Sequence, residues 1–290
     1  MVTLAPAARI DLHTHSWCSD GTEAPGVVVA QAAKAGLDVI GLTDHDVVSG
    51  WAQADAAGRE QGVLVVPGIE VSCNWRGISV HLLAYLPDPH DEPLLAELSA
   101  SRSSRDTRLQ RMVKLLAADG YPITYDEVLE MAAAQASLGR PHIADVLVRH
   151  GVFPSRDEAF ADVLSSDSRY YVAHHAPDPV HATEMIVAAG GVPVIAHPFA
   201  SKRGKVVSDD LLADMADAGM VGVEVDHRDH GPSERAHAAA LADRLRLVQT
   251  GSSDYHGAGK PNRLGENTTR IASLEAILER ATGTGLLGAH

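Results

Sequence analysis

Nine potential metal ligands, all imidazoles or carboxylates, are spread along the sequence, and most of them lie at or just beyond the C-terminal end of a short apolar run. They are His13, His15, Asp20, His45, Glu70, His81, His197, Asp254 and His256. Active sites of α/β barrels are built at that end of the strands. Imidazoles and carboxylates in this number suit two or three divalent ions. The placement therefore predicts a barrel with a multi-metal site at one face.

Predicted strands and helices alternate in the first third of the chain and again in its last part. Short apolar runs indicate strands over residues 9–13, 39–43, 63–69, 78–85, 192–196, 221–225 and 247–250. An early helix is expected to be capped by Thr22, to carry Pro25 in its first turn and to end at Gly36. Further helical patterns cover residues 49–62 and 178–189 and begin at Ser208 and Ser233. Near-continuous apolar strands are typical of a parallel sheet, and about seven βα units approach the eight of a full barrel.

A stretch in the middle of the chain shows helical patterns only. They cover residues 92–119, 124–136, 141–149 and 155–164. We therefore expect a helical insertion over residues 92–169, with residues 1–91 and 170–290 forming the barrel. The glycine-rich end, residues 283–290, is expected to be a frayed tail.

Charge and cysteine content exclude several kinds of partner. A net charge of −14 argues against a long surface for duplex nucleic acid, although bound cations would still admit a small phosphorylated substrate. Cys18 and Cys73 offer no disulfide framework, so we expect a cytoplasmic location. Residues 1–6 carry no signal-peptide pattern, and no apolar run is long enough to span a membrane. The sequence leaves the oligomeric state open.

The ligand pattern has alternative explanations when its parts are taken singly. The pair His13 and His15 can arise by chance, although side chains two apart on a strand do share a face. Glu70 ends a strongly apolar strand, where a buried carboxylate needs a cation or several donors. An arginine partner would also satisfy Glu70, but it would leave the histidines unexplained. The coincidence of the whole set favours the metal site.

These motifs resemble the PHP (polymerase and histidinol phosphatase) family of metal-dependent phosphoesterases. The resemblance rests on residues 11–16 (DLHTHS), 19–22 (SDGT), 42–46 (LTDHD), 68–72 (GIEVS), His81, 190–198 ending in AHP, and 251–257 (GSSDYHG). It implies a distorted (βα)7 barrel with a trinuclear site.

The resemblance also implies how the ligands divide among three metals. The first set is His13, His15, Glu70 and Asp254; the second is Glu70, His81 and His197; the third is Asp20, His45 and His256. Manganese, iron, zinc and magnesium all fit such nitrogen and oxygen ligands.

A rival interpretation is the amidohydrolase barrel, which also opens with two histidines two apart and usually bridges its metals with a modified lysine. None of the five lysines ends a credible strand, and Glu70 takes the bridging place instead. We therefore expect hydrolysis of a phosphomonoester by metal-activated hydroxide, with Glu70, Asp254 and His197 as catalytic groups. His230 is a candidate general acid that could also bind phosphate, and His227 is a second candidate acid. Both could equally be plain structural histidines.

Residues 139–144 (GRPHIA) resemble a segment of PHP members that act on nucleoside 3′,5′-bisphosphates and short RNA 5′ ends. The resemblance implies that Arg140 grips a second phosphate, although Arg140 could instead form a helix-capping contact or a surface ion pair. His142 could assist Arg140 or simply face the barrel. Tyr170 and Tyr171 are candidates for base stacking or for core packing. Alternative functions are a histidinol-phosphate or cyclic-phosphodiester hydrolase, and a non-catalytic metal-binding module for a partner.

Two basic segments remain, and for both a solvated surface is the favoured interpretation. The first is the row Arg102, Arg105, Arg108 and Arg111, which could instead guide an oligonucleotide. The second is Lys202, Arg203 and Lys205, which follow His197 and could reach a phosphate.

Overall fold

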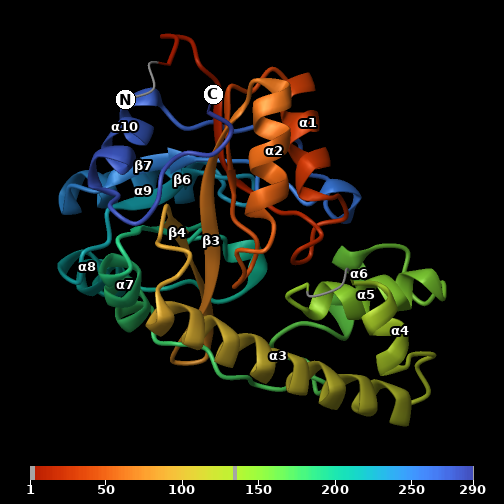
Figure 1. The fold of residues 1–290 in the computed structure, drawn as a ribbon. Helices are drawn as coiled ribbons and strands as arrows, with labels where there is room; N and C mark the ends of the chain where they lie inside the picture. Colours follow the sequence, from red (N-terminus) through yellow and green to blue (C-terminus); the bar gives the residue numbers. More distant parts are fainter. Residues whose placement is uncertain (1–3, 133–135, 290) are drawn as a thin grey trace.

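Seven strands form one mixed sheet that is nearly closed into a barrel in the computed structural model, which describes residues 4–132 and 136–289 (Figure 1). The strands follow one another in the sheet in chain order: β1 (Ile10–Thr14), β2 (Val39–Leu42), β3 (Leu64–Trp75), β4 (Ile78–Tyr85), β5 (Val192–Ala196), β6 (Gly222–Asp226) and β7 (Val248–Gly251). A bridge between Thr14 and Tyr255 joins the end of β1 to the segment that follows β7. The predicted barrel-like fold is confirmed.

The expectation of a parallel sheet is wrong at β4, which runs antiparallel to both β3 and β5. Only Arg76 and Gly77 separate β3 from β4, and both adopt positive φ. Two residues can form a hairpin turn but not the crossover that a parallel pair requires. The chain must therefore reverse, and β3 and β4 have no helix between them.

Six helices surround the strands: α1 (Pro25–Lys34), α2 (Trp51–Gln61), α7 (Pro179–Ala188), α8 (Asp209–Asp217), α9 (Pro232–Leu245) and α10 (Ile271–Arg280). Helices α1, α2, α7, α8 and α9 bury apolar side chains in a common core with β2 to β6. Leu274 and Ile277 of α10 belong to a separate cluster with strand residues such as Leu12 and Val194. The sequence interpretation did not include α10.

Two local expectations about the barrel are wrong. Thr22 does not cap α1, because the N-cap is Ala24, and the Thr22 hydroxyl instead accepts a hydrogen bond from the backbone of Ala258. The end of the chain is not frayed over its described part, since Leu287 exchanges two backbone hydrogen bonds with Val65. This extra pairing anchors the segment after α10 on the barrel.

Four helices lie between β4 and α7: α3 (Glu92–Ala118), α4 (Tyr125–Glu130), α5 (Arg140–Arg149) and α6 (Arg156–Asp162). We call residues 92–169 the helical arm. The helix expected over 124–136 ends at Glu130, and residues 133–135 of that range lie outside the described residues. Figure 1 shows α3 leading away from the barrel, with α4, α5 and α6 grouped along its far half.

The long helix α3 takes part in two separate apolar cores. Leu94 and Leu98 near its start pack in the barrel core. Leu109 and Met112 in its second half pack with Ile143 and other residues of the arm. With 27 residues the helix is about 40 Å long, which is enough to connect the two cores. The domain boundary expected at residues 91 and 92 remains a prediction.

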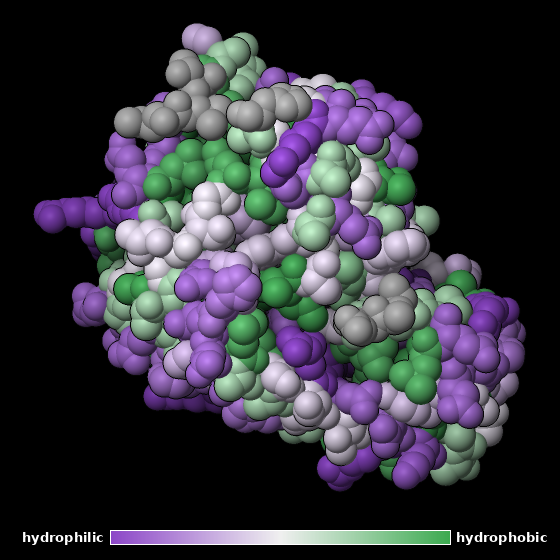
Figure 2. Space-filling view, in the orientation of Figure 1, coloured by the Kyte–Doolittle hydropathy of each residue, from purple (hydrophilic) through white to green (hydrophobic). Residues whose placement is uncertain are grey.

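The surface in Figure 2 mixes hydrophilic and hydrophobic residues, and the arm carries a predominantly hydrophilic edge. Within residues 4–132 and 136–289, no helix combines the length and the apolar character needed to cross a membrane.

Candidate metal centre

The first group of donor atoms lies where β1 ends against Glu70 of β3. The Nε2 atoms of His13 and His15 are 3.0 Å apart and lie 3.1 and 2.9 Å from Oε2 of Glu70. Oδ1 of Asp254 completes the group at 3.6 and 3.5 Å from the same nitrogens. All four side chains are buried. Two imidazole nitrogens and two carboxylate oxygens thus face one point.

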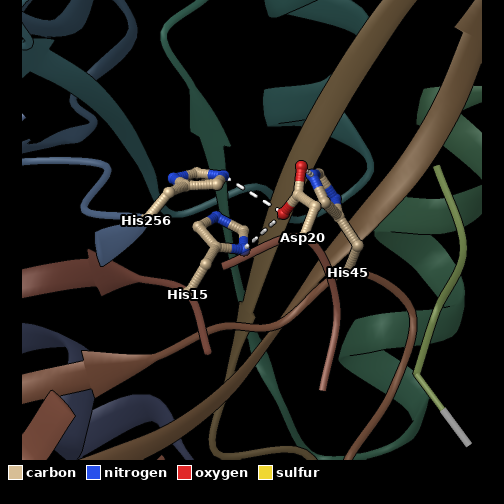
Figure 3. A group of neighbouring side chains, drawn as sticks. All are labelled: His15, Asp20, His45 and His256. Carbon is tan, nitrogen blue, oxygen red and sulfur yellow. Dashed lines mark ion pairs between the residues drawn. The ribbon is translucent and has the colours of Figure 1, made fainter. Parts of the chain in front are cut away.

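A second group shares His15 with the first and adds Asp20, His45 and His256. Figure 3 shows the three imidazoles arranged around the Asp20 carboxylate. Nε2 of His256 lies 3.1 Å from Oδ1 of Asp20, and Nε2 of His45 lies 3.9 Å from Oδ2. A backbone hydrogen bond from His15 to Tyr255 and the bridge from Thr14 to Tyr255 bring the segment with His256 to this place.

The third group surrounds the other oxygen of Glu70. Nδ1 of His81 lies 2.7 Å and Nε2 of His197 lies 3.3 Å from Oε1, while Nε2 of His45 is 3.4 Å from Oε2. The antiparallel strand β4 makes this possible, since it carries His81 between β3 with Glu70 and the end of β5 with His197. Glu70 therefore belongs to the first and third groups, and we call all nine residues the metal cluster.

The donors fit divalent cations on chemical grounds. In each of these groups, one donor atom per residue lies within 4.8 Å of the others, apart from His197, which approaches Glu70 in the third group. Nε2 of His256, which lies beside Asp20, is buried and has no hydrogen-bond partner among the described residues. The short His256–Asp20 contact thus lacks hydrogen-bond geometry, as expected for two atoms directed at a shared third one. Buried orphan nitrogens beside carboxylates are donors suited to a metal ion.

The carboxylates of the cluster are held in their charged form. Burial opposes ionisation of Glu70, but the neighbouring His45, His13 and His81 outweigh it and keep its pKa well below the usual range. Burial likewise opposes ionisation of Asp254, and Lys260 and His256 outweigh it to lower the pKa of that group. Two anions at the centre can therefore receive cations.

Glu224 of β6 is a functional candidate that the sequence interpretation missed. Its Oε1 lies 3.3 Å from Nδ1 of His13, and its Oε2 accepts the backbone N–H of His197 at 2.9 Å. A carboxylate on the rear nitrogen of a histidine orients the ring and fixes its tautomer, so that Nε2 is free to ligate. The signal was present, because Glu224 is an acid inside an apolar strand, just as Glu70 is.

Two residues of the cluster have a left-handed backbone. His197 has a φ of 31° and Asp254 a φ of 54°. Such a conformation is unfavourable for residues other than glycine and persists only where the surrounding structure holds it, as often happens at functional sites. The strand ends are therefore bent to aim these side chains at the cluster.

The two candidate acids differ in their contacts. His230 uses both ring nitrogens on the backbone: Nδ1 donates to Val225 at 2.9 Å and Nε2 accepts from Phe199 at 3.2 Å. His227 is fully buried, and its Nδ1 accepts from the backbone of Asp229. Nε2 of His227 has no hydrogen-bond partner in the described part of the chain and lies 3.5 Å from Oδ2 of Asp254. Of the two, His227 has the nitrogen that is free beside the cluster.

The arginine row of α3 is not a solvated face, which corrects the favoured interpretation. Arg105 and Arg108 are only 5% and 6% exposed. Arg105 is bonded to the carboxylate of Asp46 and the hydroxyl of Ser72, which are close neighbours of His45 and Glu70 in the sequence. The buried part of the row thus approaches the metal cluster.

Arg108, Arg140 and His174 form a second, cationic group that we call the arginine cluster. Nη1 of Arg108 lies 3.0 Å from Nδ1 of His174, and Nη1 of Arg140 donates to the carbonyl of Leu164 at 2.7 Å. Within the described residues, neither arginine pairs with a carboxylate, and the buried Nε of Arg108 has no partner. Burial, with Arg140 and Arg105 close by, lowers the pKa of Arg108 to about 9.

The other arm candidates have structural contacts. Nδ1 of His142 accepts the backbone N–H of Gly139 at 3.0 Å, where its helix begins, and the side chain is buried. Tyr170 packs in the arm core, and the ring of Tyr171 lies under the guanidinium of Arg140 at 5.6 Å. Arg156 connects the arm with the metal cluster, since it binds Asp145 through two contacts of 2.6 Å and donates to the carbonyl of Asp20 at 3.0 Å.

The basic loop after His197 is only partly a solvated surface. Lys202 and Lys205 are exposed, as expected. Arg203 instead reaches the metal cluster, where Nη2 donates to Oδ2 of Asp254 at 2.6 Å. Lys260 contacts the same oxygen at 3.1 Å.

Comparisons with known proteins agree with this geometry. Residues 11–144 match the PHP domain family. The chain is 34% identical to a 3′,5′-nucleoside bisphosphate phosphatase from Chromobacterium violaceum, with 88% of this chain and 90% of the relative covered. It is 30% identical to a 5′-3′ exoribonuclease from Haemophilus influenzae, over 94% of this chain and 98% of the relative.

Two further similarities extend the comparison. A phosphoribosyl 1,2-cyclic phosphate 1,2-diphosphodiesterase from Eggerthella lenta is 35% identical, with 85% of this chain and 94% of the relative covered. A crystal structure from Bifidobacterium adolescentis, described as a candidate metal-dependent phosphoesterase, superposes with a TM-score of 0.91 at 39% identity. It covers 96% of this chain and 98% of that one.

Proposed function

The chain belongs to the PHP domain family of metal-dependent phosphoesterases, and on that premise we propose that it removes a phosphate from a nucleoside 3′,5′-bisphosphate or a short 5′-phosphorylated oligonucleotide. The observation that carries this choice is the arginine cluster, a positive group outside the metal cluster in which Arg108 is buried and Arg140 half-buried. A substrate with two phosphates would use both clusters, whereas a simple phosphomonoester would use one.

We propose that the nine residues of the metal cluster hold two to three divalent cations, in the sets expected from the sequence. Cations bound there would supply Lewis acidity that activates water and neutralises the phosphoryl oxygens. Glu70 would serve two positions through its two oxygens, and Glu224 would orient His13 and support the backbone at His197. Asp254, in the segment after β7, and His197, directly after β5, would hold these cations beside the reacting phosphoryl group.

The departing oxygen would receive a hydrogen bond from the region beside Asp254. We assign this contact to His227 in preference to His230, because Nδ1 of His227 accepts a backbone N–H and leaves the ring proton on the free Nε2, whereas both ring nitrogens of His230 are bonded to the backbone. His230 would then position the loop at Phe199 instead of touching the substrate phosphate.

The arm would select the substrate. Arg105 contacts Asp46 beside the metal cluster, and Arg108 lies three residues further along α3, which is a rise of about 4.5 Å. The arginines therefore step outward from the cluster, and Arg108 with Arg140 would bind the second phosphate through charge-assisted hydrogen bonds. Nδ1 of His142 already caps its own helix, so this residue would support Arg140 from within α5.

A phosphate-release assay with Mn²⁺ tests the proposal. We expect a higher kcat/KM for adenosine 3′,5′-bisphosphate than for adenosine 5′-monophosphate, and Arg140→Gln should lower only the value for the bisphosphate. Arg149→Gln, at the exposed end of the same helix, is the matched control. Equal values for the two nucleotides, or an equal loss of both in Arg140→Gln, would refute the second-phosphate role.

Hydrolysis of a cyclic phosphodiester is the second candidate, and the 35% identity to the Eggerthella lenta enzyme favours it. A ribose 1,2-cyclic phosphate and histidinol phosphate therefore belong in the same assay. Turnover of the cyclic ester above that of the bisphosphate would replace our first choice with this one.

A further inference from the structure

The guanidinium of Arg203 connects three groups at the edge of the metal cluster. Nε donates to Oδ2 of Asp229 at 2.5 Å, Nη2 donates to Oδ2 of Asp254 at 2.6 Å, and Nη1 lies 3.1 Å from Nε2 of His197. The side chain is 32% exposed, whereas those of Asp254 and His197 are 2% and 9% exposed. Arg203 thus reaches from the surface onto two expected metal ligands.

The contact with His197 has one chemical interpretation. A guanidinium has five N–H donors and no acceptor, so Nε2 of His197 must present its lone pair to Arg203. The same Nε2 lies 3.3 Å from Oε1 of Glu70, a pair of electron-rich atoms that a cation would join. An imidazole nitrogen has one lone pair, and a metal ion bound to Nε2 would use it.

We propose that Arg203 is an internal competitor for the divalent cation that His197 and Glu70 would hold, and that binding of this cation displaces Nη1 of Arg203 from His197. The inference rests on the metal centre proposed above and adds a residue of this chain that opposes its loading. Arg203 has two other anchors, Asp229 and Oδ2 of Asp254, and it binds them through Nε and Nη2 instead of Nη1.

Lys260 serves as a control for the effect of positive charge alone on Mn²⁺ binding. Its Nζ contacts Oδ2 of Asp254, the same oxygen that Arg203 binds, but among the described contacts it has none with His197. Removal of either positively charged side chain, Lys260 or Arg203, strengthens the attraction of the site for Mn²⁺ through charge alone. Only removal of Arg203 also frees the lone pair of His197.

The experiment is a Mn²⁺ titration of the full chain, followed by electron paramagnetic resonance of the free ion, for wild type, Arg203→Met and Lys260→Met. We expect the dissociation constant of the most weakly bound Mn²⁺ to be about tenfold lower in Arg203→Met than in Lys260→Met. A difference of this size corresponds to the loss of one charge-assisted hydrogen bond. The additional gain should vanish in the His197→Ala background, where no lone pair remains to compete for. Thermal unfolding with and without Mn²⁺ checks that each variant is folded.

Arg203→Lys is the second variant. It keeps the positive charge but not the guanidinium fork that reaches His197, so it should tighten Mn²⁺ binding by a smaller factor. Equal tightening in Arg203→Met and Lys260→Met would overturn the inference, as would a gain that persists without His197 or no gain at all. If the wild-type chain bound no Mn²⁺, the proposed metal centre would fail and the inference with it. Binding that is unchanged in Arg203→Met and Arg203→Lys would overturn the inference alone.

Discussion

The metal cluster and the arginine cluster bury charge in opposite ways. In the metal cluster, the carboxylate of Glu70 is surrounded by imidazoles, and that of Asp254 by imidazoles together with Arg203 and Lys260. In the arm, Arg108 and Arg140 are guanidiniums whose neighbours are a histidine, aromatic rings and a carbonyl. Buried charge without a full partner is unfavourable, so we expect each cluster to bind a ligand of opposite sign.

The difference indicates how the two regions divide the work. One region suits cations, which would carry out the chemistry, and the other suits an anion, which would identify the substrate. The contacts of Arg105 with Asp46 and of Arg156 with Asp20 connect the two regions on either side of the metal cluster. The following predictions test this division, beginning with the largest effect.

Glu70→Gln should abolish the function of the metal cluster while leaving the arginine cluster intact. The amide keeps the shape of the side chain but removes the charge that faces His13, His15 and His81. We expect kcat to fall on the order of a thousandfold or more and at least one Mn²⁺ to be lost per chain. Steady-state kinetics and metal analysis of the purified variant measure both.

Glu60→Gln, on the exposed surface of α2, is the matched control for this charge change. Binding of adenosine 3′,5′-bisphosphate through the arginine cluster should survive in Glu70→Gln. A variant that kept its metal content and most of its activity would show that Glu70 is a structural acid.

Arg108→Gln should have the opposite profile. We expect kcat/KM for the bisphosphate to fall about ten- to a hundredfold, with little change for the monophosphate, since charge-assisted hydrogen bonds to one phosphate are lost. The thermal midpoint without substrate should stay level or rise, because burial and two neighbouring arginines disfavour the charge on Arg108. Arg111→Gln, exposed on the same helix, should change neither quantity. A lower midpoint together with an equal loss for both substrates would assign Arg108 to folding.

The sequence was sufficient to single out the nine residues that the fold brings together in the metal cluster, for a physical reason. Ligands at strand ends are brought together by the topology of a barrel, so their positions relative to apolar runs carry the information. Glu70 and His81 are exceptions. Glu70 was expected to end its strand but lies inside β3, and His81 lies inside β4 and reaches Glu70 through a hairpin that the expectation of a parallel sheet did not include. Here the two-residue link between the strands was the signal.

The arginine row could not be interpreted in the same way. Spacing of three along a helix does not determine which face is covered, and the covering comes from α5 and the segment with His174, far away in the sequence. Glu224 and Arg203 were missed or assigned to the surface for a related reason. Their partners, His13 and Asp254, lie 211 and 51 residues away and become neighbours only in the folded barrel.

The smallest expected effect concerns His174, whose pKa responds to the positive charges of the arginine cluster. Burial and the nearby Arg108, Arg105 and Arg140 lower its pKa to about 3, from an ordinary value of 6.5. Between these values the unfolded chain takes up a proton that the folded chain does not, so His174 reduces stability as the pH falls from 6.5 toward 3 and has no such effect above 6.5. In His174→Asn, the free energy of unfolding should therefore fall less steeply between pH 6.5 and pH 4 than in wild type, as urea titrations would measure.

Arg108→Gln should reduce the same slope in part, because it removes one of the charges that lower the pKa of His174. Parallel slopes in all three proteins would mean that the arginines do not act on His174, and the contrast between an anionic and a cationic cluster would then rest on the metal cluster alone.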